Sequence, residues 1–268
     1  MSRWTDAIVV QLPNNLTNDG HCSKIDLQRA KKEQQEMCEI LRHSGVNVFE
    51  LSPEENAPAA TLLVEDVAVV CNGTALLAKP GHSSRRREIL AIIMELGFYI
   101  IDLAQHPESS KILLEGSDVL FTGREFFVGI GKKTNVAGAM EVARAFPEYS
   151  VTPVKVNGPH HLKYYVCLAA PNVLSVGQCK EAQNILKRIE REATFRYQTL
   201  TFNDENVVNC INANGSLLYR PEFHGSLEKF GLLQDTKLNP VAFTELSKIG
   251  MLSQQVLLLR KLKIFKNL

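Results

Sequence analysis

The chain has 268 residues, and 45% of them are hydrophobic, which is enough for a sizeable core. Thirty basic and 29 acidic residues give a formal net charge of +1, which excludes the strong basic field typical of nucleic-acid or membrane-surface binding. The N-terminus has no long apolar stretch, and no run approaches the roughly eighteen apolar residues of a membrane span. We therefore expect a cytoplasmic protein, a single domain over residues 1–268, that binds neither nucleic acid nor membrane.

The cysteines indicate no disulfide framework and no metal site. They show no Cys-x-x-Cys motif and no Cys–His spacing typical of a metal ligand set. We expect reduced thiols, with Cys167 and Cys210 packed in the core, and neither a metal nor a cofactor. The six residues are Cys22, Cys38, Cys71, Cys167, Cys179 and Cys210.

Strands and helices are predicted to alternate along the chain. An apolar strand over residues 7–12 precedes a helix over about 25–44. Four turn pairs then follow, each between two apolar, β-branched runs, as in a hairpin. The pairs are Asn72-Gly73, Thr122-Gly123, Pro171-Asn172 and Asn214-Gly215. Helical periodicity covers residues 85–96, 135–145 and 180–193, and less clearly 227–233.

This pattern repeats at a near-constant interval. Residues 64–77 and 115–128 are two versions of one unit, with acidic residues before an apolar strand, a glycine turn and a second strand. Five such units favour a closed α/β array with one central pocket over an open sheet. The alternative is an ordinary mixed α/β protein whose hairpins are evenly spaced by accident. Carboxylates at the start of repeated strands suit a cationic ligand, above all a planar guanidinium.

These segments carry a family resemblance. Together with residues 79–86, 129–135 and 161–163, they closely resemble the dimethylarginine dimethylaminohydrolases, and the match runs from about residue 7 to 248. The resemblance implies the pentein fold, a five-bladed α/β propeller of strand-hairpin and helix units. It also implies hydrolysis of methylated arginines to citrulline and a methylamine, and a small guanidino or methylated-arginine ligand.

The resemblance also assigns candidate site residues. His161 matches the catalytic histidine, and Glu115 lies where the family has the supporting acid. The candidates for substrate binding are Glu65, Asp66, Arg85, Lys133 and Ile249. The alternative readings are a solvated strand end for Glu65 and Asp66, a structural histidine for His161 beside His160, and an exposed helix start for Arg85.

Hydrolysis of a guanidinium needs a strong nucleophile, because its positive charge is delocalised over three nitrogens. A thiolate serves this purpose, and a histidine protonates the leaving amine and then activates water. In the family the reactive cysteine lies near the C-terminus, but this chain has Gln254 at that position and no cysteine after Cys210. Ser253 is the nearest hydroxyl. To take the position of Gln254, the strand would have to shift by one residue, and such a shift turns each side chain to the opposite face of the strand.

Other positions depart from the family pattern as well. The position where the family has an aspartate falls near Ala60, and the position of a family arginine is occupied by Lys133. The segment from Asn14 to Lys24 is shorter than the family's substrate lid. The first change removes a carboxylate, and the second keeps a charge but loses the bidentate fork of arginine.

Three functions stay open from the sequence. The first is a catalytically impaired, guanidine-binding member of the family, which is the reading that Gln254 favours. The second is an active methylarginine hydrolase with an unlocated nucleophile or an altered C-terminal segment. The third is a scaffold protein whose basic, leucine-rich end binds a partner, although residues 256–259 fit the closing strand of the last blade equally well. The protein is expected to be a monomer or a homodimer.

Overall fold

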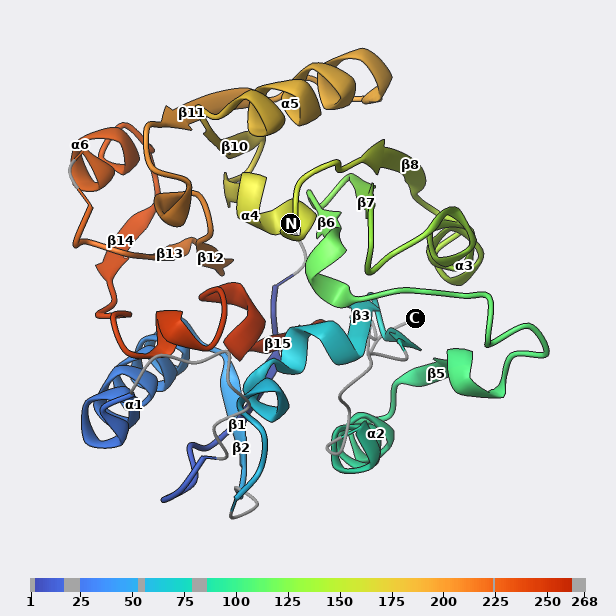
Figure 1. The fold of residues 1–268 in the computed structure, drawn as a ribbon, viewed down its shortest axis with the longest axis horizontal. Helices are drawn as coiled ribbons and strands as arrows, with labels where there is room; N and C mark the ends of the chain where they lie inside the picture. Colours follow the sequence, from blue (N-terminus) through green and yellow to red (C-terminus); the bar gives the residue numbers. More distant parts are fainter. Residues whose placement is uncertain (1–2, 17–24, 53–55, 79–85, 224, 262–268) are drawn as a thin grey trace, which may run out of the picture.

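A computed structural model describes residues 3–16, 25–52, 56–78, 86–223 and 225–261. In this part of the chain, fifteen strands form five three-stranded sheets. The sheets surround a common centre, and the helices α1, α2, α3, α5 and α6 lie on the outside (Figure 1). The arrangement confirms the predicted five-bladed α/β propeller.

Each blade has the same internal order. Its first two strands are antiparallel, and its third strand runs parallel to the second after a crossover through a helix. In sheet order, the strands are β15 (Leu257–Leu259), β1 (Asp6–Val10) and β2 (Asn47–Leu51); β3 (Ala68–Cys71), β4 (Thr74–Leu77) and β5 (Tyr99–Asp102); β6 (Val119–Phe121), β7 (Glu125–Ile130) and β8 (Ser150–Lys155); β9 (Val166–Ala170), β10 (Val173–Gly177) and β11 (Gln198–Phe202); and β12 (Ile211–Ala213), β13 (Ser216–Tyr219) and β14 (Lys237–Pro240).

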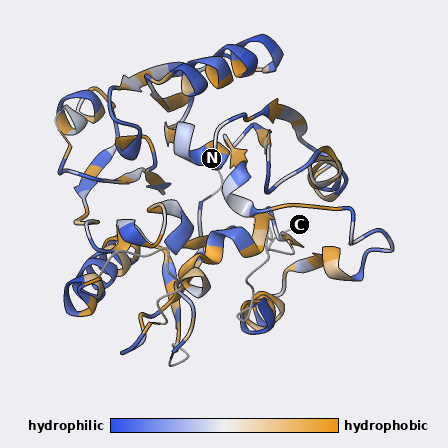
Figure 2. Cartoon of the chain, viewed as in Figure 1, coloured by the Kyte–Doolittle hydropathy of each residue, from blue (hydrophilic) through white to orange (hydrophobic). Residues whose placement is uncertain are grey.

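The crossover helices are amphipathic, and one side of each packs against the sheets (Figure 2). In α5, Ala182, Ile185, Leu186 and Ile189 recur at helical spacing and are buried. The crossover helices are α1 (Leu27–His43), α2 (Arg86–Glu95), α3 (Val136–Ala145), α5 (Lys180–Glu192) and α6 (Ser226–Phe230). A further short helix, α4 (Leu162–Tyr165), precedes β9.

The hairpin turns form where the sequence predicts them. Asn72 and Gly73 both have positive φ, as do Asn214 and Gly215, which is what a type I′ turn requires. Asparagine and glycine tolerate this conformation at low cost. Because the turns join the first and second strands of each blade, they all lie at the same end of the propeller axis.

The ring is closed by the two ends of the described chain. Strand β15 pairs antiparallel with β1, with Leu259 opposite Asp6 and Leu257 opposite Ile8. The predicted closing strand over residues 256–259 is therefore present. It completes the blade that the N-terminal strand begins.

The sequence patterns missed the third strand of every blade. These strands are only half-buried; for example, β2 and β5 contain no fully buried residue. Most of them lack the continuous apolar runs that mark the two inner strands, although β5 contains the run Tyr99, Ile100 and Ile101. The predicted helix over 227–233 is shorter, covering Ser226–Phe230.

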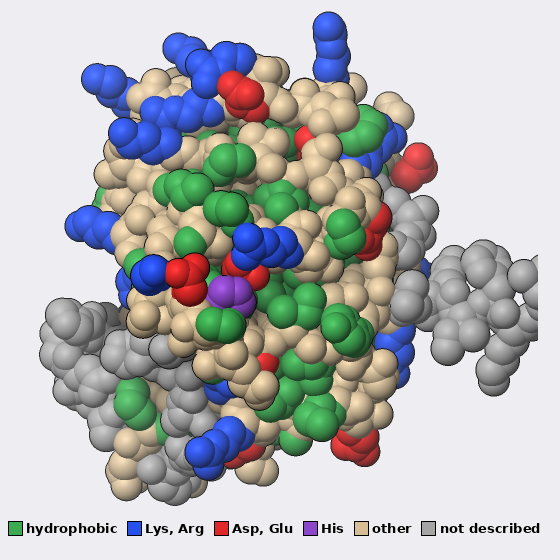
Figure 3. All heavy atoms as spheres, turned by 90° about the vertical axis from the view of Figure 1, so that its right-hand side faces the viewer, with side chains coloured by type: hydrophobic (Ala, Val, Ile, Leu, Met, Phe, Trp, Pro, Cys, Tyr) green, Lys and Arg blue, Asp and Glu red, His purple; other side chains and the backbone are tan. Residues whose placement is uncertain are grey.

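The face of the molecule that Figure 3 shows is not uniformly charged. On the side of the molecule that carries α3 and β5, Lys and Arg side chains lie mostly near the edges, and apolar side chains are scattered between them (Figure 3). Among the described residues, no helix combines the length and apolar character needed to cross a membrane.

Candidate functional site

The site is assembled from segments that lead into the first strand of each blade. The short 3-10 helix Val64–Val67 carries Asp66 into β3, and Glu115 precedes the 3-10 turn before β6. His161 is the N-cap residue of α4, which enters β9. Gln254 lies in the 3-10 turn Ser253–Gln255 before β15. These four equivalent strand starts converge at the end of the axis opposite the hairpin turns.

His161 forms the centre of an acidic cluster. Its Nε2 lies 2.7 Å from Glu115 Oε2, and the side chain is only 17% exposed. Burial by itself lowers the pKa of His161, but the Glu115 hydrogen bond and the charges of Asp118, Asp66 and Glu115 outweigh it and raise this pKa to about 9. Burial also raises the pKa of Glu115, but His161 and Lys133 outweigh that effect and leave it lowered. At neutral pH the pair is therefore an imidazolium–carboxylate ion pair.

Gln254 is bonded directly to this cluster. Its Nε2 donates to Asp66 Oδ2 at 3.0 Å, and its Oε1 accepts from the backbone N–H of Met251 at 2.9 Å. The other oxygen of Asp66 accepts from the backbone N–H of Ser117. Burial raises the pKa of Asp66 to about 6 despite the opposing charge of His161. The carboxamide thus satisfies one oxygen of the buried Asp66 carboxylate.

Asp118 fixes the histidine segment in place. Its Oδ1 accepts from the backbone N–H of Leu162 at the start of α4, and its Oδ2 accepts from the hydroxyl of Thr134. A carboxylate at a helix start satisfies an orphan N–H and interacts favourably with the helix dipole. The blade that supplies Glu115 therefore also orients His161.

A second polar group lies on the other side of this cluster. Lys163 Nζ lies 2.6 Å from Glu65 Oε1, and Glu65 Oε2 accepts from Ser253 and Ser117. The backbones approach closely here, since a Cβ at Gly116 would lie 1.9 Å from the carbonyl oxygen of Glu65. Glu65 and Ser253 thus point away from their neighbours Asp66 and Gln254.

A cavity of about 400 Å³ opens on the His161 side, and we name it the His161 cavity. Its wall includes His161, Gln254 and Ile249, whereas Asp66 and Glu115 lie behind the first two, to which they are hydrogen-bonded. Other polar side chains on the wall are those of His160, Glu205, Asn206, Asn209, Arg220 and Lys248. The volume suits a ligand the size of an amino acid.

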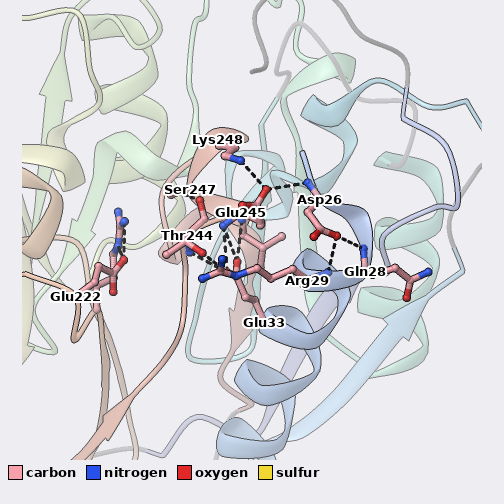
Figure 4. A network of polar contacts seen from close by, with 11 residues as sticks. Asp26, Gln28, Arg29, Glu33, Glu222, Thr244, Glu245, Ser247 and Lys248 are labelled. Carbon is pink, nitrogen blue, oxygen red and sulfur yellow. Dashed lines mark hydrogen bonds and ion pairs between the residues drawn. The ribbon is translucent and has the colours of Figure 1, made fainter. Parts of the chain in front are cut away.

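The wall segment at residues 244–249 is held by helix α1 through Glu33 (Figure 4). The Glu33 side chain is 2% exposed and accepts from the backbone N–H groups of Thr244, Glu245 and Leu246 and from the Thr244 hydroxyl. Glu245 in turn accepts from the backbone N–H of Asp26 and from Lys248 Nζ. A buried carboxylate thereby positions the segment that contains Ile249.

The structure brings most of the predicted site residues together. His161, Glu115, Asp66 and Gln254 form one connected cluster, and Lys133 Nζ lies 3.5 Å from Glu115 Oε1. The carboxylate of Glu65 instead bonds to Lys163, Ser117 and Ser253, so its role as a ligand for substrate stays a prediction. Arg85 and the lid residues 17–24 lie outside the described residues.

The sequence reasoning assigned no role to three residues that organise the site. They are Asp118, Lys163 and Asn209, whose side-chain amide bonds to the backbone N–H and hydroxyl of Ser253. Asn209 lies just before β12, in register with the site residues of the other blades. An alignment of the repeated units would therefore have indicated Asn209 as a site residue.

The cysteines described by the structure, all but Cys22, are free thiols. Cys167 and Cys210 are buried and contact each other's strands, as predicted for core thiols. Among these described thiols none hydrogen-bonds to His161, whose imidazole is bonded to Glu115.

One group of side chains in the described ranges is close enough to hold a metal ion. The ligand atoms of Asp66, Glu115 and His161 lie within 4.8 Å of one another. The ring nitrogen of His161 faces Glu115 and is hydrogen-bonded to it, so a metal ion would have to displace this contact and its proton. A metal-free site therefore stays our prediction.

Comparison with known proteins identifies the family of this chain. The family model described as eukaryotic N,N dimethylarginine dimethylhydrolase matches residues 12–213. Human DDAH2 is 32% identical over 267 residues, covering 93% of this chain and 92% of the human protein. The chain belongs to the dimethylarginine dimethylaminohydrolase family. The family member of Streptomyces coelicolor is 30% identical over 172 residues, covering 62% of this chain and 64% of that protein.

Solved structures of similar proteins confirm the pentein fold. A Pseudomonas aeruginosa family member, a cysteine-to-serine mutant in complex with citrulline, superposes with a TM-score of 0.76 at 22% identity, covering 96% of this chain and 99% of that chain. The N-terminal domain of cyanobacterial ArgZ, an arginine dihydrolase bound to its product, gives a TM-score of 0.77 at 18% identity, with 96% and 98% coverage.

The His161–Glu115 pair predicts a pH-dependent stability. The pKa of His161 is raised from 6.5 to about 9, so its contribution is fully present below pH 6.5 and is lost as the pH rises through 9. The loss is on the order of 3 kcal/mol. We expect the unfolding free energy measured by urea denaturation to fall between pH 6.5 and 9, and this fall to disappear in His161→Ala. An unchanged slope in the variant would contradict the assignment.

Proposed function

We propose that this protein is a catalytically impaired member of the family that retains a pocket for a guanidino or methylated-arginine ligand. The observation that carries the proposal is Gln254, which lies on the His161 cavity and is bonded to Asp66. A carboxamide cannot attack carbon as a thiolate does. Loss of the nucleophile of a covalent hydrolase typically costs about a millionfold in turnover.

The other groups needed for guanidine chemistry support a retained pocket. His161 is cationic at neutral pH and could donate a proton to a leaving amine, and Glu115 orients its ring. Asp66 carries a carboxylate at the base of the cluster, where it could bind a guanidinium once Gln254 moves aside. Lys133 and Arg220 are cationic groups in or near the wall that could accept the ligand's carboxylate.

Ser253 offers little as a substitute nucleophile. Its hydroxyl donates to Glu65 and accepts from Asn209, on the side of the 3-10 turn away from the His161 cavity. The opposite orientation of neighbouring side chains therefore separates the hydroxyl from the histidine that would activate it.

The proposal is tested by two measurements on the full chain. In a citrulline assay with asymmetric dimethylarginine, we expect no release above background. In calorimetric titrations we expect saturable binding of arginine, methylated arginines or citrulline, weakened by Asp66→Asn, with the exposed Asp235→Asn as a control. Citrulline release abolished by His161→Ala would instead identify an active hydrolase. Neither release nor binding would favour a scaffold protein.

A further inference from the structure

A second cavity lies at the opposite end of the propeller axis, and we name it the hairpin cavity. Its volume is about 420 Å³, and its rim includes the turn residues Thr122, Gly123, Pro171, Asn214 and Gly215. Its walls are formed largely by the apolar first strands of the blades. The ion pair of Glu65 and Lys163 lies at the inner end, next to the acidic cluster of the His161 cavity.

A buried cation, Arg260, forms part of this wall. Arg260 is 7% exposed, and its buried Nε has no hydrogen-bond partner. Within the described ranges its guanidinium makes no hydrogen bond or ion pair, although buried charges in proteins are usually paired. It is instead held between two aromatic rings, with its Cζ 4.5 Å from the centroid of Trp4 and 5.5 Å from that of Phe121.

The charge of Arg260 is not balanced by the rest of the cavity. Glu65 is the acidic residue among the described lining residues, and its carboxylate is bonded to Lys163. Arg3 adds another basic side chain to the lining. The described wall therefore combines apolar strands with a net positive charge, a combination that suits an anion with an apolar body.

We propose that the hairpin cavity binds a small amphipathic carboxylate. The carboxylate accepts hydrogen bonds from the Arg260 guanidinium, whose planar fork matches its two oxygens. The apolar body lies against Val69, Leu120, Ile211 and Leu257, which line the cavity. The aromatic contacts hold Arg260 in place, so little side-chain freedom is lost on binding.

Trp4 is an intrinsic fluorescence probe for this cavity. Trp4 is the only tryptophan in the sequence, it stacks on Arg260, and its Nε1 donates to the backbone oxygen of Asn212. A ligand that binds Arg260 therefore changes the surroundings of the indole. Intrinsic fluorescence excited at the tryptophan band then reports on the hairpin cavity and not on the His161 cavity.

The test is a fluorescence titration of the full chain with sodium octanoate. We expect a saturable change with affinity at least tenfold higher than for 1-octanol, which has the same chain without the charge, and no comparable change with sodium acetate. Equal affinities for octanoate and octanol, or the absence of a saturable change, would overturn the proposal.

Variants of Arg260 test the role of the guanidinium. Arg260→Gln is expected to weaken octanoate binding at least tenfold and to leave octanol binding unchanged, whereas Arg260→Lys retains part of the preference. The matched control is Arg42→Gln, which removes an exposed arginine that pairs with Glu50 on another surface. If Arg260→Gln does not fold, as judged by circular dichroism, the proposal is tested by the ratio of the octanoate and octanol affinities of Arg260→Lys. A ratio equal to that of the wild type in either folded variant would refute the assignment.

Discussion

Replacement of Gln254 by cysteine is expected to give the protein measurable methylarginine hydrolysis. The change supplies a thiol on the His161 cavity and removes the amide that donates to Asp66. The imidazolium of His161 favours ionisation of a nearby thiol and could protonate the leaving amine. We expect citrulline release at least about a hundredfold above that of the wild type. This gain is much smaller than the roughly millionfold loss of turnover that removal of such a nucleophile causes.

Two controls separate this effect from a general opening of the site. Gln254→Ser supplies a poorer nucleophile of similar size and should stay inactive. The double variant Gln254→Cys/His161→Ala should lose the gained activity while keeping the thiol. A folded Gln254→Cys protein that binds methylarginine but releases no citrulline would show that position 254 is not where the family's nucleophile acts.

Replacement of Glu33 by alanine is expected to destabilise the fold strongly. The variant leaves the N–H groups of Thr244, Glu245 and Leu246 without their acceptor, and each buried unsatisfied group costs about 1–3 kcal/mol. We expect the unfolding free energy to fall by about 4 kcal/mol or more, measured by chemical denaturation. The same change should loosen the wall that contains Ile249 and weaken binding in the His161 cavity.

The matched control for this experiment is Glu36→Ala. Glu36 is an exposed glutamate on the same helix, so the replacement tests the helix without touching the 244–246 segment. It should change the unfolding free energy by less than about 0.5 kcal/mol. Similar effects from the two substitutions would mean that the buried carboxylate does not anchor the segment.

Local sequence signals were sufficient to predict the inner strands and the hairpin turns of the propeller. Asn72-Gly73 and Asn214-Gly215 specify turns because their positive φ values are accessible to few other residues. The apolar runs on both sides of these turns mark buried strands, and their even spacing predicts a closed array. Strands such as β14, which lies at a sheet edge and has no fully buried residue, carry no comparable pattern.

The candidate site could be predicted only in part, because its residues are adjacent in space and not in sequence. The family resemblance gave His161, Glu115, Asp66 and Gln254, which the structure places in one cluster. It gave no indication that Asn209 bonds to Ser253 or that Glu33 binds a segment more than 200 residues away. Such contacts depend on closure of the ring, which no local pattern encodes.

The sequence by itself determined the repeated blade and the family, and it predicted that a carboxamide stands at position 254 where the family has its reactive thiol. Only the tertiary structure decided which way each side chain at the strand starts points. Neighbouring residues along these segments face opposite ends of the axis, so Asp66 and Gln254 belong to the His161 cavity while Glu65 and Ser253 belong to the other side. The same packing buries Arg260 against two aromatic rings with no anionic partner among the described residues, which no pattern in the sequence reveals.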